Sequence, residues 1–128
     1  MMKLRGVLLT GVLIVTTAAG ALGASAADRD RLVAHAVVRY ALDVQHYQLI
    51  PAVDHVVVVG AYALADWESG ETDGESLVKR SASGWRVVAA VPQAFTERAL
   101  VRRGVPASVA RRLIDRIGTM ERGQTAAG

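Results

Sequence analysis

The fold is decided by residues 53–91, which read VDHVVVVGAYALADWESGETDGESLVKRSASGWRVVAAV. Four segments of this stretch are expected to be strands, and the first of them is dense in β-branched residues, a composition that is typical of strands. They cover residues 53–59, 62–68, 75–80 and 85–91. The links between them are Gly60-Ala61, the polar loop 69–74 and the turn 81–84. Because links this short favour neighbouring antiparallel strands, the stretch predicts a four-stranded antiparallel meander.

A helix is predicted before the strands. Asp28 is a candidate N-cap, because its carboxylate can accept hydrogen bonds from free backbone N–H groups. Behind it, apolar residues recur at steps of three and four, which places them on one face of a helix over residues 29–47. They are Val33, Val37, Tyr40, Val44 and Tyr47. This apolar stripe is expected to cover one face of the sheet, and a curved sheet wrapped on one helix can leave a cleft.

Two short helices are predicted after Pro92, a residue that interrupts a sheet ladder. The first covers residues 93–102 and is ended by Gly104 as a left-handed cap. Pro106 suits the first turn of the second, whose apolar stripe is Val105, Val109, Leu113 and Ile117. The chain is therefore expected to be α+β, with an N-terminal helix packed on a four-stranded antiparallel meander and two short C-terminal helices.

Residues 1–26 predict a secretory signal peptide. Lys3 and Arg5 precede an uncharged apolar stretch, and Ala24-Ser25-Ala26 offers small residues at the positions that a signal peptidase reads. We expect cleavage near Ala26 and a mature protein in the periplasm or secreted. An uncleaved membrane anchor is the alternative, but a spanning helix needs about 20 apolar residues. Residues 27–122 are then expected to form one domain and residues 123–128 a disordered tail.

Charge is unevenly distributed along the expected mature chain. Removal of Lys3 and Arg5 leaves 13 of the 15 basic residues against 12 acidic ones, so the net charge says little about partners. Acids cluster around the second and third strands, and arginines around the last helix. Candidates for surface contacts are Asp66, Glu68, Glu71, Asp73, Arg111, Arg112 and Arg116. Solvated faces are the alternative, with Arg111 paired to Asp115 four residues along the helix.

A metal site is one hypothesis for the histidines. His35 and His46 lie eleven residues apart on the predicted helix, which separates them by roughly 16 Å. His46 and His55 could approach each other across the turn at Pro51, together with Asp54. These three residues are the candidate metal ligands, and ordinary surface histidines are the alternative. The chain has no Cys, so soft thiolate ligands, disulfides and a lipid anchor on Cys are all excluded.

The sequence contains no recognisable pattern of catalytic residues. Residues 74–78 read GESLV, which departs from the G-x-S-x-G pattern of a nucleophile elbow. The paired carboxylates are expected on a loop, which holds catalytic geometry poorly. We therefore expect no enzyme, no catalytic residues and no bound cofactor. Nucleic acid is not expected as a partner in an exported protein.

The motifs from the first turn onward resemble a family of small bacterial periplasmic proteins labelled copper uptake system-associated. The resemblance covers about half of the expected mature chain. It rests on Gly60, Tyr62-Ala63, Trp67, the turn 70–74, Leu77-Val78-Lys79-Arg80, Gly84-Trp85, Gly104-Val105-Pro106, Ala110 and Leu113. Family members tend to carry a Cys-Gly segment after the fourth strand, where this chain has Ala89-Ala90-Val91-Pro92.

The resemblance implies a periplasmic location and adds copper as the ion to test. The chain is expected to be an exported accessory or binding protein without enzymatic activity. It would have an unknown protein partner in the cell envelope and no stable membrane anchor after cleavage. The alternative is a copper-handling protein that uses His46, His55 and nearby acids.

Overall fold

The computed structural model describes the backbone of residues 25–127 and the side chains of residues 25–123. The predicted signal peptide lies outside the described residues, apart from Ser25 and Ala26. The elements are α2 (Ala26–Asp43), β1 (Ala52–Val59), β2 (Tyr62–Ser69), β3 (Thr72–Ser81), β4 (Gly84–Pro92), α3 (Glu97–Arg102) and α4 (Ala107–Ala127). The four strands form one antiparallel sheet in the order β1-β2-β3-β4. The predicted α+β class and the meander are confirmed.

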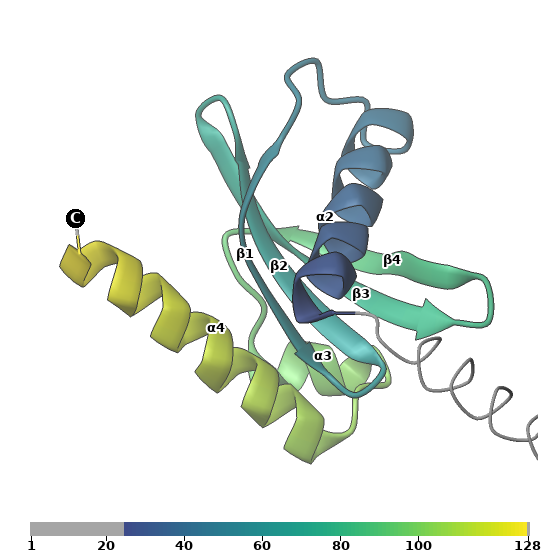
Figure 1. Ribbon diagram of the computed structural model, residues 1–128, viewed down its shortest axis with the longest axis vertical. Helices are drawn as coiled ribbons and strands as arrows, with labels where there is room; N and C mark the ends of the chain where they lie inside the picture. The colour runs from purple at the N-terminus through teal and green to yellow at the C-terminus, as the bar shows by residue number, and fades with distance from the viewer. Residues whose placement is uncertain (1–24, 128) are drawn as a thin grey trace, which may run out of the picture.

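The sheet is covered on both faces (Figure 1). On one face α2 buries Val33 and Val37 against Ala63, Ala65, Trp67 and Val78. On the other, α3, α4 and the link between them bury Leu100, Val105, Leu113 and Ile117 against Val57, Leu64 and Leu77. Alternate strand residues point to opposite faces, so each strand contributes to both cores. Among the described residues, no helix is long and apolar enough to cross a membrane.

Three cross-strand rows make up the face that α3 and α4 cover. The central row is apolar and consists of Val57, Leu64, Leu77 and Ala89. The row at one end contains Val59, Tyr62, Lys79 and Arg86. The row at the other end contains His55, Asp66, Glu75 and Val91. The register therefore places one histidine and two acids side by side, directly beyond the apolar centre of the sheet.

The N-terminal helix begins and ends earlier than the sequence predicts. Ser25, and not Asp28, is the N-cap, because its side chain accepts the backbone N–H of Asp28. Asp28 instead binds Arg31, and the hydrogen bond from the Ser25 side chain lowers the pKa of Asp28, as does Arg31. The helix ends at Asp43, so Tyr47 packs against the Trp67 ring from the following loop.

Three further boundaries differ from the prediction. The expected loop 69–74 is a two-residue turn at Gly70-Glu71, so β2 and β3 pair up to Ser69 and Thr72. Residues 93–96 are not helical, because Gln93 has φ +67° and Thr96 caps α3 through its hydroxyl group. Helix α4 continues to Ala127, where a disordered tail was expected from Gly123.

Candidate functional site

The candidate site is the polar end of the face that α4 covers. His55 on β1 and Asp66 on β2 form its tightest pair, with the His55 Nδ1 2.8 Å from Asp66 Oδ2 and 3.1 Å from Oδ1. The His55 backbone N–H donates to Asp66 Oδ1 as well, at 2.7 Å. Their side chains are only 12% and 14% exposed. An ionised carboxylate can only accept hydrogen bonds, so its contact with His55 requires a form of the imidazole that carries a proton on Nδ1.

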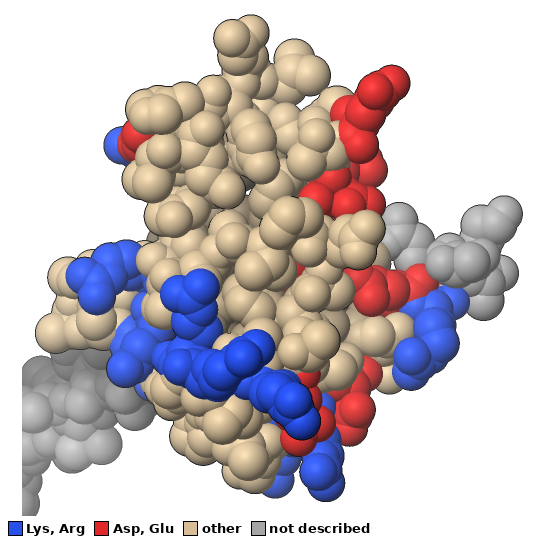
Figure 2. Space-filling view, turned by 180° about the vertical axis from the view of Figure 1, so that it is seen from behind, with Lys and Arg blue, Asp and Glu red and all other residues tan. Residues whose placement is uncertain are grey.

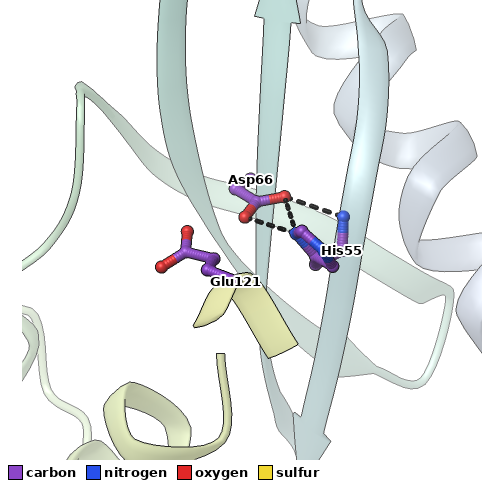
Figure 3. A group of neighbouring side chains, drawn as sticks. All are labelled: His55, Asp66 and Glu121. Carbon is purple, nitrogen blue, oxygen red and sulfur yellow. Dashed lines mark hydrogen bonds and ion pairs between the residues drawn. The ribbon is translucent and has the colours of Figure 1, made fainter. Parts of the chain in front are cut away.

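Glu121 joins this pair from α4 (Figure 3). It lies four residues after the buried Ile117, on the same side of the helix. A hydrogen bond with Asp66 and, after it in size, partial burial raise the pKa of Glu121 from its ordinary 4.5 to about 6. The hydrogen bond has this effect because two carboxylates can share it only while one of them is protonated.

Glu75 on β3 lies directly opposite Asp66 and is 2% exposed. Its Oε1 accepts the backbone N–H of Phe95 at 2.9 Å. Burial raises the pKa of Glu75 to about 7, and the charges of Glu121 and Asp66 add to this increase. The Phe95 hydrogen bond opposes it, since that bond stabilises the ionised form. The site therefore gathers three carboxyl groups, and two of them, Glu75 and Glu121, have raised pKa values.

A positive ion suits this arrangement. One ligand atom from each of His55, Asp66 and Glu121 lies within 4.8 Å of the others. Imidazole nitrogen and carboxylate oxygen bind Zn²⁺ at about 2.0–2.2 Å, which separates neighbouring ligands by roughly 3.3 Å in a tetrahedron. The distance between His55 Nδ1 and Asp66 Oδ2 is 2.8 Å, so it would have to increase by only a few tenths of an ångström. A divalent ion would replace the shared protons and offset the repulsion between the carboxylates.

The structure places only one of the three metal ligands predicted from the sequence in this group of side chains. His55 is in the cluster, but His46 and Asp54 are not members of this group. His46 is exposed in the loop after α2 and has φ +58°. Asp54 is exposed where the β1–β2 register shifts between Val53 and His55.

The candidate contact residues also lie in different places. Asp66 belongs to the cluster, whereas Glu68, Glu71 and Asp73 are exposed around the β2–β3 turn. Arg111 pairs with Glu97 of α3 at 3.6 Å, not with Asp115. Arg116 donates to the Val58 carbonyl oxygen of β1 at 3.2 Å and so ties α4 to the sheet. Arg112 is exposed on α4.

Glu75 and Glu121 were missed at the sequence level, although both left a signal. Glu75 lies two residues before Leu77, and Asp66 lies two residues after Leu64, so strand alternation puts both acids on the buried face. Glu121 extends the stripe of Leu113 and Ile117 by one more step of four. An acid that continues an apolar stripe is the pattern that identifies this site.

A separate groove of about 470 Å³ lies between α2 and β4, on the other side of the sheet. Trp85 and Val87 of β4 line it together with Leu32, Ala36 and Tyr40 of α2. Its lining is mostly apolar, so it resembles the cleft expected from the sequence and could take apolar side chains. His35 and Arg39 lie at the same groove, with Arg39 paired to Asp43.

No protein-family model, curated protein or solved structure matched the chain when it was compared with them. The resemblance to the copper uptake system-associated family therefore stays a prediction that rests on the turn and core motifs. What the site can do is argued below from its own geometry.

Proposed function

We propose that this protein is an exported accessory protein that binds a divalent transition-metal ion through His55, Asp66 and Glu121. The observation that carries the proposal is the convergence of these three side chains, from β1, β2 and α4, within 4.8 Å. One imidazole with two carboxylates suits Zn²⁺ or Cu²⁺. Cu⁺ fits poorly, because it prefers the sulfur ligands that this cluster lacks.

The proposed role is to hold and pass on an ion, not to catalyse a reaction. Three protein ligands leave a coordination position open, which allows water or a ligand from a partner to reach the ion. Glu121 would favour exchange of the ion with the surroundings, because it is the exposed member of the set and lies in the C-terminal part of α4. Asp66 and His55 are the less exposed members of the set, and Glu75 lies opposite Asp66 on the neighbouring strand.

Isothermal titration calorimetry of the full chain tests this function, with ZnCl₂, CuCl₂ and CaCl₂ titrated separately at pH 7.5. We expect one ion of Zn²⁺ or Cu²⁺ per chain and weaker binding of Ca²⁺, which prefers six to eight oxygen ligands. His55→Ala and Glu121→Gln should each weaken binding at least about tenfold, since they remove or neutralise a ligand.

His46→Ala is the matched control, because it removes an exposed imidazole outside the cluster. Its affinity should equal that of the unsubstituted chain. Glu121→Gln changes an exposed helical residue, so a folded variant is expected, and circular dichroism checks this. The proposed site would be refuted if His55→Ala and Glu121→Gln bound the ion as tightly as His46→Ala and the unsubstituted chain. Loss of binding in His46→Ala would instead favour the ligand set predicted from the sequence.

A further inference from the structure

Two cations face each other at the end of the sheet opposite the metal-binding cluster. Lys79 on β3 and Arg86 on β4 are direct cross-strand partners, and both are exposed. Like charges in this position destabilise a sheet. Among the described residues, neither cation forms an ion pair, and the Lys79 ammonium group lies 5.6 Å from the centre of the Tyr62 ring.

Tyr62 connects this pair to a second group of cations. Its hydroxyl donates to the carbonyl oxygen of Gly104, at 3.4 Å, directly after α3. Arg98, Arg102 and Arg103 lie on α3 and at its end, and all three are exposed. We call Lys79, Arg86, Arg98, Arg102 and Arg103 the basic face. Figure 2 shows Lys and Arg side chains gathered in a band on this side of the molecule, with most Asp and Glu along another edge.

The basic face is not neutralised by nearby acids. Among the described residues, none of these five forms an ion pair with an Asp or Glu within 4.0 Å, and Glu97 of α3 is paired with Arg111 instead. Val101 lies between Arg98 and Arg102 in the sequence and is 43% exposed. Arg98 and Arg102 are four residues apart on α3, so they extend from the same side of the helix. The region therefore combines unpaired cations with an accessible apolar side chain.

We propose that the basic face binds the surface of an anionic phospholipid bilayer. Phosphate headgroups provide the complementary charge that the fold itself does not. Long Lys and Arg side chains can follow a broad surface of headgroups, and Val101 can contact the boundary with the acyl chains. Three secondary-structure elements, β3, β4 and α3, contribute to the face, so the domain would have a fixed orientation on the bilayer.

Vesicle co-sedimentation of the full chain tests this proposal. The vesicles contain equal parts of phosphatidylglycerol and phosphatidylcholine, or phosphatidylcholine alone, which measures any contribution of the apolar N-terminal residues. The double variant Lys79→Gln, Arg86→Gln should bind the anionic vesicles roughly 25-fold more weakly, because each cation at such a surface contributes roughly fivefold. The matched control is Arg31→Gln, Arg39→Gln on α2, which removes the same net charge elsewhere and should retain most of the binding.

Equal weakening in the two double variants would overturn the proposal, because net charge alone would then account for binding. Equal binding to both kinds of vesicle would overturn it as well. Sedimentation equilibrium and titration with poly-glutamate complete the test. Suppose that the chain does not bind anionic vesicles but self-associates, and that Lys79→Gln, Arg86→Gln abolishes the self-association. The face would then be assigned to a second copy of the chain. Poly-glutamate binding that the same double variant abolishes would assign it to an acidic protein.

Discussion

Asp66 and Glu75 are direct partners across the β2–β3 ladder, and both face α4. Two carboxylates in such positions repel each other unless a proton or a cation lies nearby. His55 binds Asp66 from one side, and the Phe95 N–H binds Glu75 from the other. The pair therefore has a donor at each end, while Glu121 adds a third carboxyl group. We therefore expect both the stability and the proposed ion binding to depend on pH.

Glu75→Gln should stabilise the protein at pH 8 and have little effect at pH 4.5. Burial raises the pKa of Glu75 to about 7 from its ordinary value of 4.5, so the folded state keeps a proton that the unfolded chain has released. The free energy of unfolding should therefore fall as pH rises between these values, by up to about 3 kcal/mol. The Gln side chain still accepts the Phe95 N–H but cannot ionise.

Urea unfolding at several pH values between 4.5 and 8 measures this difference. The fall in stability over this range should be smaller in Glu75→Gln than in the unsubstituted chain. A constant difference at every pH would show that packing, and not ionisation of Glu75, distinguishes the two proteins.

Affinity for the proposed ion should fall as pH decreases from 7.5 to 5. An ion must displace the protons that the cluster binds, and the pKa of Glu121 is raised to about 6 by its hydrogen bond with Asp66. Each displaced proton weakens binding by roughly tenfold per pH unit below the pKa of its group. Calorimetric titration with ZnCl₂ at pH 5, 6, 7 and 7.5 measures the slope, and Glu121→Gln should reduce it. An affinity independent of pH would contradict the participation of these carboxylates.

The meander could be predicted from sequence because its signals are local. Gly60, Gly70 and Gly84 all have positive φ angles at the three turns, and β1 before the first turn is dense in valine. The starts of two helices were predicted wrongly, because each helix is capped by a hydroxyl side chain that the sequence pattern did not single out. Ser25 caps α2 from before the predicted start of that helix, whereas Thr96 caps α3 from within the segment predicted to be helical.

The site was only partly predictable, because it depends on register and on distant elements. His55 and Asp66 were each singled out, but only the β1–β2 register makes them partners, and that register contains a shift beside His55. Glu121 is 55 residues beyond Asp66 and reaches it because α4 crosses the sheet (Figure 1). The local pattern places Glu121 on the buried side of its helix, but it does not say which strand residues Glu121 meets. The pairing of His46 with His55 was inferred because the two residues are close in the sequence. In the structure His55 groups with Asp66 and Glu121, and His46 is not part of that group.

Gly74→Ala should destabilise the protein by about 1–3 kcal/mol through overpacking. A Cβ at this position would lie 2.4 Å from Cζ2 of the buried Trp67 and 2.8 Å from the Val91 carbonyl oxygen. Gly118→Ala is the matched control, because its Cβ would meet only the flexible end of Arg122. Within a helix this change should stabilise by about 0.5–1 kcal/mol. Thermal unfolding of both variants measures the contrast, and equal shifts would argue against a steric need for glycine at position 74.

Ser76→Ala should destabilise the core below α2, although it removes only one oxygen atom. The indole N–H of Trp67 donates to the Ser76 hydroxyl at 3.0 Å, and both residues are buried. Without that acceptor the N–H would remain buried and unsatisfied, at a cost of about 1–3 kcal/mol. In a Trp67→Phe background no indole N–H is present, so the same Ser76→Ala change should cost much less.

A double-mutant cycle on these two positions isolates the hydrogen bond from the rest of the Trp67 packing, which includes the Tyr47 ring at 5.4 Å. The four proteins are compared by urea unfolding at one pH. We expect a coupling energy of about 1 kcal/mol or more, because the N–H has no water to replace its partner in a buried position. Additive effects would mean that the indole finds another acceptor when Ser76 is replaced, and that the Trp67 ring is held by packing alone.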